Sequence, residues 1–441
     1  MQEYFFHIAD HLSSLLHADE IYTCSFSAED SDFVRFNRSA VRQAGTVSQR
    51  YLELDLIKGR RHSEGTVSLS GDADVDRTRV AQLLAASREK LPYLPEDPHL
   101  LYATEVRSSE HHGKNQLPED SAAIVASILE AGRGHDLVGI YAAGGIHNGF
   151  ANSFGQRNWF SSYSYNFDWS FFLQGDKAVK TGYAGFVWNP AEFARKVEVA
   201  REELTVLARP PRTISPGRYR VYLAPTALVE IIGLLSWGGF GLKDHRTKQT
   251  TLLKMAEGNA RLHPMLSLTE NTRDGVAPNF QDAGFLKPDQ VLLIDHGEFR
   301  NCLVSPRSAQ EYAVPTNGAG DSEMPESIDL AAGTVASQDV LRQLDTGIYI
   351  NNLWYLNYSD RPACRITGMT RFATFWVERG EIHAPLNVMR FDETLYRMLG
   401  ENLEGLTSER DFILDSGTYG SRSTSSSRVP GALVKDFTFT L

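Results

Sequence analysis

The residue of this chain with the clearest chemistry is Glu230, the one acidic side chain in an otherwise apolar segment. Residues 225–237 are predicted to form a helix after a strand at 218–223. A carboxylate in such a place acts as a general base when a metal-bound water lies beside it. Nothing in this apolar segment points to such a water, so the residues alone favour a structural role for Glu230, which would pair with a local arginine or face solvent.

Two sets of histidines have ligand chemistry without a convincing arrangement. His7 and His11 are four residues apart in a predicted helix, a spacing that suits zinc. Both lie opposite the apolar face of that helix and no third ligand follows, which favours a solvated surface. His245, His263 and Asp244 form a second set, but their spacing gives no reason to expect that they converge. The sequence therefore predicts no metal site.

The segment around the end of the apolar helix argues against two other kinds of site. A G-x-S-x-G nucleophile turn centred on Ser236 needs glycine at position 234, which is leucine. Gly238, Gly239 and Gly241 do not directly follow a strand, as a dinucleotide-binding fingerprint requires. These glycines predict a C-terminal cap and a mobile loop.

Helical and strand-like residue patterns predict which elements position these residues. Apolar residues at helical spacing predict helices at 5–16, 74–91, 120–131, 191–207 and 225–237, and a polar helix is expected at 248–255. Strand-like runs occur at 21–27, 33–36, 48–56, 67–69, 291–295, 299–304, 347–355, 364–377 and 434–439, and residues 137–188 form an antiparallel-looking region. His296-Gly297 and Arg379-Gly380 are hairpin signals. From Tyr163 to Trp169 the aromatic residues alternate with polar ones, which favours a sheet core over an exposed peptide-binding surface.

The length of 441 residues indicates two domains. Three prolines and a glycine between residues 208 and 217 end the preceding helix and form the linker. We expect an N-terminal α+β domain at 1–209 with mixed helices and antiparallel sheet. The second domain, 217–441, is expected to be mainly antiparallel sheet or partial barrel with one early helix.

Composition excludes several classes of protein. The net charge of −11 and the lack of a lysine or arginine cluster argue against direct nucleic-acid binding. No apolar run is long enough to cross a membrane, and the first twenty residues do not have the pattern of a signal peptide, so we expect a cytoplasmic protein. Cys24, Cys302 and Cys364 are far apart and odd in number, which favours reduced thiols.

Short motifs in the last hundred residues carry a family resemblance. In order they are the segments 345–350 (DTGIYI), 367–368 (TG), 372–382 (FATFWVERGEI) and 417–420 (GTYG). Together they resemble the TldD/PmbA family, whose members are also known as modulators of DNA gyrase. Residues 152–155 (NSFG) and 315–318 (PTNG) extend the likeness more loosely towards the N-terminus.

The resemblance implies where a metal would be held. Zinc-bearing TldD-like members have His-Glu-x-x-x-His on the helix that corresponds to 229–234, and a cysteine in the segment that corresponds to 417–420. Here Glu230 is kept, but the ligand positions are Val229, Leu234 and Tyr419. The chain thus resembles the PmbA/TldE-like branch, which lacks the metal site, so no zinc or other cofactor is expected in this chain.

By the same resemblance, we expect Glu230 to match the general-base position and Gly238, Gly239, Gly241 and Tyr419 to border a peptide groove. The serine-rich segment 421–428 is expected to be a solvated, disordered loop near that groove.

The leading hypothesis is a non-metal-binding subunit of a TldD/TldE-type cytosolic metallopeptidase that acts on unfolded or extended peptides. Its partner would be a TldD-like subunit, which would supply zinc and cleavage. Two alternatives stay open. One is a stand-alone peptidase or hydrolase with unconventional catalytic residues, and the other is a peptide-binding homodimer without catalysis.

Overall fold

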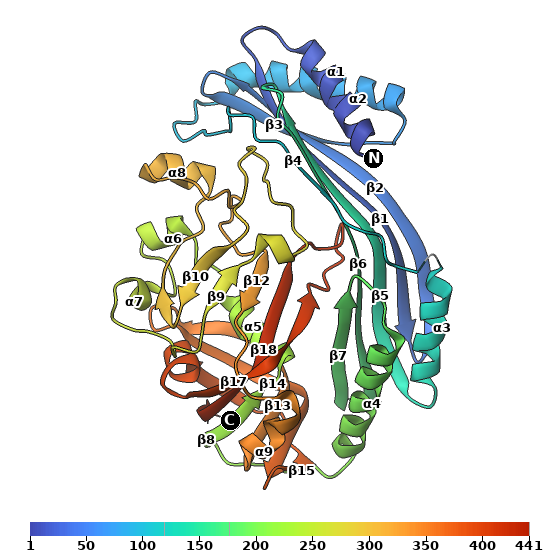
Figure 1. Ribbon diagram of the computed structural model, residues 1–441, viewed down its shortest axis with the longest axis vertical. Helices are drawn as coiled ribbons and strands as arrows, with labels where there is room; N and C mark the ends of the chain where they lie inside the picture. The colour runs from blue at the N-terminus through green and yellow to red at the C-terminus, as the bar shows by residue number, and fades with distance from the viewer. Residues whose placement is uncertain (119, 176, 441) are drawn as a thin grey trace.

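The computed structural model describes residues 1–118, 120–175 and 177–440 and has an α+β fold of two domains built on two β-sheets. Figure 1 shows that the first sheet is long and arched. It runs down one side of the molecule and bends over the top of the second sheet. The two sheets therefore face each other along much of the molecule.

The first sheet has the strand order β3-β2-β1-β5-β6-β4, and β7 also pairs with β6. Every pairing is antiparallel except that of β4 with β6. Its strands are β1 (Ile21–Asn37), β2 (Ala40–Lys58), β3 (Arg61–Ser68), β4 (Ser109–His112), β5 (Asp136–Asn152), β6 (Arg157–Gln174) and β7 (Lys177–Gly185).

The break that the sequence pattern predicts after residue 27 is absent, because β1 continues through its polar middle. Thr46 donates a hydrogen bond of 2.6 Å to Asp32, and Ser48 donates one of 2.5 Å to Asp30. These bonds between the two strands give the carboxylates of Asp30 and Asp32 a partner. The alternation of apolar and polar residues, taken alone, indicates a loop at these two positions.

Four helices pack on the first sheet, two near its upper end and two lower down (Figure 1). They are α1 (Gln2–Leu15), α2 (Ala73–Lys90), α3 (Ser121–Gly132) and α4 (Pro190–Leu207). The alternating aromatics of β6 are sheet core as predicted, since Tyr165, Phe167 and Trp169 are at most 1% exposed.

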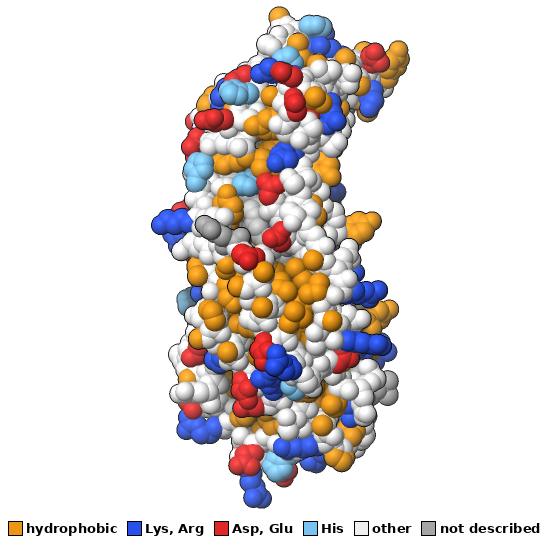
Figure 2. Space-filling model, turned by 90° about the vertical axis from the view of Figure 1, so that its right-hand side faces the viewer, with side chains coloured by type: hydrophobic (Ala, Val, Ile, Leu, Met, Phe, Trp, Pro, Cys, Tyr) orange, Lys and Arg blue, Asp and Glu red, His pale blue; other side chains and the backbone are white. Residues whose placement is uncertain are grey.

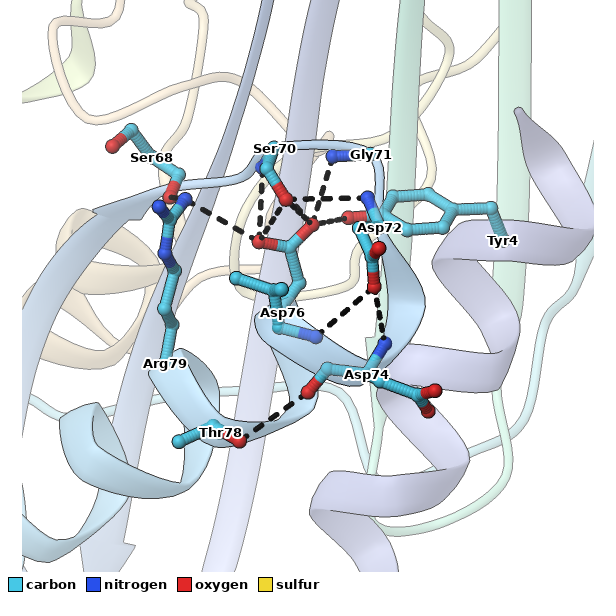
Figure 3. Close-up of polar contacts among 10 residues, drawn as sticks. Tyr4, Ser68, Ser70, Gly71, Asp72, Asp74, Asp76, Thr78 and Arg79 are labelled. Atoms are coloured by element: carbon cyan, nitrogen blue, oxygen red, sulfur yellow. Dashed lines mark hydrogen bonds and ion pairs between the residues drawn. The ribbon is translucent and has the colours of Figure 1, made fainter.

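A buried carboxylate, Asp76, connects the N-terminus of α2 to α1 (Figure 3). It accepts hydrogen bonds from the Tyr4 hydroxyl at 2.6 Å, from the Ser70 backbone N–H at 2.9 Å and from the Gly71 N–H at 2.8 Å. Asp72 caps the helix by accepting from the N–H groups of residues 74 and 75. This network fixes where α2 begins.

On the side of the molecule formed by the arched sheet, Figure 2 shows hydrophobic side chains gathered at mid-height. Helix α3, which Figure 1 shows on this side of the molecule, exposes the small side chains of Ala122, Ala123 and Ala126. None of the helices in the described ranges has the length and apolar character needed to cross a membrane.

The second sheet is mixed, with mostly antiparallel pairings. Its strands are β8 (Gly217–Leu223), β9 (Leu268–Glu270), β10 (Val291–Asp295), β11 (Glu298–Phe299), β12 (Ser327–Leu330), β13 (Gly347–Asp360), β14 (Arg365–Glu378), β15 (Glu381–Pro385), β16 (Arg390–Thr394), β17 (Leu403–Leu414) and β18 (Ser426–Phe439). The helices of this half are α5 (Pro225–Leu235), α6 (Leu242–Arg246), α7 (Leu253–Ala256), α8 (Pro306–Tyr312) and α9 (Val340–Leu344). Short helical turns are η1 (Leu91–Tyr93), η2 (Thr272–Asp274), η3 (Ser337–Asp339) and η4 (Arg397–Glu401).

Five strands of the second sheet close into a ring. β8 pairs with β13, β13 with β14, β14 with β16, β16 with β18, and β18 returns to β8. The expected partial barrel is therefore present, with apolar residues such as Val221, Ile348 and Val434 in its core. Two hairpins that the sequence predicts are also found. The residues at their tips, His296-Gly297 and Arg379-Gly380, all have positive φ.

The predicted polar helix at 248–255 is wrong. In its place α6 ends at Arg246 and α7 begins at Leu253, with Lys248 between them at a φ of 58°. A side-chain-bearing residue in this left-handed conformation interrupts a helix.

The linker between α4 and β8 is bound to the second sheet. The Arg212 N–H donates to the Pro385 carbonyl at 2.8 Å, and its guanidinium lies 4.3 Å from the Trp376 ring centre. The two halves also share a core, because Ala373 and Phe375 of β14 pack in the aromatic cluster of β6 and α4. The limits 1–209 and 217–441 for the two domains stay a prediction.

Candidate functional site

A cavity of about 450 Å³ lies between α5, the β6–β7 hairpin and the β17–β18 pair, and we call it the α5 cavity. Residues from both sheets line it. The first sheet contributes Asn166, Asp168 and residues 180–184, and the second half contributes Thr226, Val229, Glu230, Gly233, Leu234, Trp237, Asn352, Leu356, residues 411–416, Ser425 and Ser427. The site is thus completed only when the two halves pack together.

Helix α5 positions the cavity wall because its two faces differ. Pro225 occupies its first turn, where a missing N–H costs nothing. One face is buried in the core of the second half, namely Ala227, Leu228, Ile231, Ile232 and Leu235. The other face, with Val229, Glu230, Gly233 and Leu234, lines the cavity, and so does Trp237 in the turn that follows the helix.

Glu230 is the polar side chain of this face. It is exposed within the cavity, and among the described residues it has no hydrogen-bond or ion-pair partner. The surrounding walls displace water from its carboxyl and raise its pKa. Lys180 opposes this shift and Asp168 adds to it. Of the two structural roles expected for Glu230, pairing with an arginine is not seen in the described part of the chain, whereas the side chain is exposed.

Zinc does not fit the wall formed by α5. Val229 and Leu234 present only carbon atoms to the cavity, which leaves Glu230 as the single ligand-type side chain on that face. Tyr419, the third position implied by the resemblance, is fully exposed to solvent and does not line the cavity.

Residues 415–425, which we call the strap, connect β17 to β18 by way of the first sheet. The buried side chain of Arg422 anchors the strap there. It donates to the Ser164 carbonyl at 2.9 Å, the Gly144 carbonyl at 3.2 Å and the Ser31 hydroxyl at 3.3 Å. The Arg422 N–H donates to Glu29 at 3.2 Å.

The anchored strap corrects the expectation of a solvated, disordered loop at 421–428. Residues 426–428 belong to β18, and the preceding segment is bound to the first sheet through Arg422. Figure 1 shows the strap crossing between β18 and the first sheet. Residues 415, 416 and 425 of the strap line the α5 cavity, whereas a second cavity of about 880 Å³, lined by β4, β6 and residues of the second half, has no strap residue in its lining.

The glycine loop after α5 lies beside the cavity but does not line it. Gly238 has a φ of 79°, and the Gly239 N–H donates to the Leu235 carbonyl at 2.9 Å, which confirms the predicted C-terminal cap. A Cβ at Gly239 would lie 2.2 Å from that carbonyl, and one at Gly241 would lie 3.1 Å from the side chains of residues 244 and 323. These close contacts show a packing reason for the glycines.

The second set of histidines does not form a metal site. His245 contacts the Gly239 carbonyl at 2.8 Å, whereas His263 accepts from the Met265 N–H at 3.2 Å. Within the described ranges, one group of three has donor atoms close enough to share a metal, Asp55, His62 and Glu64 on β2 and β3. None of these residues lines the α5 cavity.

Several cavity residues were not identified from the sequence. Trp237 is 56% exposed, and its spacing of four and three residues from Gly233 and Leu234 is the signal that would have placed it on the same helix face. Lys180 and Asp168 form an ion pair of 3.2 Å across the β6–β7 hairpin. That pair depends on strand register, which the sequence pattern left undefined.

Comparisons with known proteins agree with this fold. Residues 216–441 match the family described as PmbA/TldA metallopeptidase C-terminal domain. The fold is similar to TldE from Thermococcus kodakarensis, with a TM-score of 0.80, 13% identity and 99% of each chain covered. It is also similar to a protein from Thermotoga maritima proposed to modulate DNA gyrase, with a TM-score of 0.78, 14% identity and coverage of 99% of this chain and 100% of that one. No curated protein sequence matches the chain. At these identities the two structures show likeness of fold alone.

Proposed function

We propose, from the premise that this chain belongs to the TldD/PmbA family, that it is a TldE-like subunit that holds an extended peptide. A TldD-like partner would supply the zinc and the cleavage. In this role the chain contributes binding surface and excludes water from the partner's site, while it holds no zinc of its own.

The observation that carries this proposal is the cavity face of α5. In a scaffold of this family, the helix positions that correspond to the expected histidines are Val229 and Leu234, and both line the cavity. The carboxylate between them remains, but neither neighbour has a donor atom that could hold a zinc-bound water beside it. A cavity with apolar walls and a few polar side chains is suited to binding a ligand.

Two strand edges beside the cavity support an extended ligand. β7 pairs with β6 alone, so its second edge has no strand partner among the described residues, and Thr181–Ala184 on it line the cavity. Across the cavity, β17 pairs between Arg410 and Leu414 with β18 alone within the same ranges. Unpaired backbone groups at such edges accept a peptide as an added strand with little dependence on side chains.

Coexpression with a TldD-like chain from the same organism tests the proposal. We expect the two chains to copurify in equal amounts and the pair to cleave an unfolded protein, with loss of cleavage after chelation of zinc. The purified chain alone should bind the same unfolded protein without cleaving it.

Two results would contradict this function. Cleavage by the lone chain would favour the stand-alone hydrolase. A stable self-dimer that does not bind the TldD-like chain and leaves the activity of that chain unchanged would favour the peptide-binding homodimer. A Glu230→Gln variant separates these cases further, because a catalytic role for the carboxylate predicts loss of cleavage by the lone chain.

A further inference from the structure

The charges that line the α5 cavity are unbalanced. Four carboxylates face it, from Asp168, Glu230, Asp411 and Asp415, against Lys180 as the single lysine or arginine among the lining residues. Lys180 lies 3.2 Å from Asp168, so its charge is already neutralised by that partner. The cavity therefore has an excess of negative charge.

The other carboxylates of the lining have local partners, whereas Glu230 does not. Asp411 lies 3.8 Å from the ammonium group of Lys196 on α4. Asp415 accepts a hydrogen bond of 2.9 Å from the Gly417 N–H within the strap. Within the described ranges Glu230 has neither an ion pair nor a hydrogen bond, so a ligand is free to supply one.

The walls around Glu230 are apolar. Val229 and Leu234 share its helix face, and Trp237 lines the cavity from the turn after the helix. Leu356 and Phe412 line it from β13 and β17. A methylene chain ending in a cationic group matches this surface, because its stem contacts the apolar wall and its charge meets the carboxylate. The exposed indole of Trp237 adds a ring face that attracts cations.

We propose that the α5 cavity selects extended peptides that carry a lysine or arginine side chain, which it holds at Glu230. This inference rests on the proposed peptide-holding function and adds a substrate class to it. The cation gives the Glu230 carboxylate the charged hydrogen-bond partner that it lacks among the described residues. An acidic side chain at the same place would be repelled by the Glu230 carboxylate, which has no partner among the described residues.

The alternatives fit the lining less well. A free anion would have to be held by Lys180, which is paired with Asp168. A divalent cation would need several converging ligands, and in the described part of the chain the three-residue cluster that meets this condition is on β2 and β3 instead.

Isothermal titration with a set of alanine–threonine hexapeptides tests the inference. The peptides differ at one central position, which is lysine, arginine, norleucine or glutamate, and each is titrated into the purified chain and into its pair with a TldD-like chain. We expect the lysine and arginine peptides to bind at least about tenfold more tightly than the norleucine peptide, with the glutamate peptide weakest.

The variant Glu230→Gln should abolish the advantage of lysine over norleucine while both peptides still bind. Glu311→Gln, an exposed glutamate on α8 outside the cavity, is the matched control and should leave the advantage unchanged. Thermal melts of both variants check that the fold is intact.

The results separate the two proposals. Equal binding of the lysine and norleucine peptides, or an advantage that survives in Glu230→Gln, overturns the cation selectivity and leaves the peptide-holding function standing. If none of the peptides binds to the chain or to the pair, both proposals fail.

Discussion

At the scale of single residues, two buried carboxyl groups affect stability in opposite directions. Asp76 is fully buried, which alone would favour its neutral form, but hydrogen bonds from Tyr4, Ser70 and Gly71 outweigh that effect and hold its pKa below the ordinary value. Glu203 on α4 is 8% exposed, and burial raises its pKa to about 8 although Asn351 donates a hydrogen bond to it.

The first prediction concerns Asp76. Replacement by Asn removes the negative charge that accepts the hydrogen bonds from Tyr4, Ser70 and Gly71, so we expect Asp76→Asn to lower the free energy of unfolding by about 2–4 kcal/mol. Urea denaturation measures this change in stability. Because the folded-state pKa is depressed, the stabilisation is present above the unfolded pKa of about 3.9 and is lost as the pH falls through the folded value. Asp74→Asn, at a side chain that is 91% exposed, is the control and should change stability by at most about 0.5 kcal/mol. Equal effects of the two changes would contradict the prediction.

The second prediction concerns Glu203, whose folded-state pKa of about 8 lies above its unfolded value. Between roughly pH 4 and 8, Glu203 is protonated in the folded state and ionised in the unfolded state. Stability therefore declines as the pH rises through that range. In Glu203→Gln this decline should be smaller by on the order of a few kcal/mol. Melting temperatures from pH 5 to 9 measure it, and identical pH profiles for the two proteins would contradict the assignment.

At the scale of elements, the strap is where a single side chain determines the path of a loop. The third prediction is that Arg422→Met releases the strap, because Ser164 and Gly144 lose their donor and Glu29 loses a nearby positive charge. We expect a loss of about 2–4 kcal/mol in the free energy of unfolding and faster cutting by chymotrypsin at Tyr419.

Tyr419→Ala is the matched control for the strap, since that side chain is fully exposed. It should leave stability within about 0.5 kcal/mol of the parent protein. A strap that stays resistant to protease in Arg422→Met would show that the Arg422 contacts do not hold it.

The strap also marks the limit of what the sequence predicts. Local periodicity placed α5, the alternating strand around Phe167 and the hairpin at Gly380, because each depends on residues close in the chain. It placed Glu230 on the correct helix but did not show which way the Tyr419 side chain points. The path of the strap, and with it the orientation of Tyr419, depends on hydrogen bonds from Arg422 to residues more than 250 positions earlier, and such contacts leave no local sequence pattern.

At the scale of the whole molecule, the two halves share an aromatic core. Phe375 of β14 is fully buried in the cluster that contains Phe167, Trp169 and Phe193. Neither sheet completes this cluster alone, so the halves are expected to unfold together.

The fourth prediction follows from this shared core. Phe375→Ala should destabilise the protein by about 3–5 kcal/mol and shift a single calorimetric transition without splitting it. Val388→Ala, at a side chain that is 50% exposed, is the control and should shift it little. Two separate transitions in the parent protein would contradict the shared-core interpretation.

The position of the final strand has a consequence for biosynthesis. β8 begins at Gly217, but its neighbour β18 starts only at Ser426, and Arg422 occupies a site among residues 29–164. A ribosome releases the chain from the N-terminus, so both the ring and the first sheet lack a component until residues 422–439 have been synthesised. A message cut short before the codons for these residues would therefore yield a product with two unfinished surfaces, which suits it for capture by chaperones and proteases.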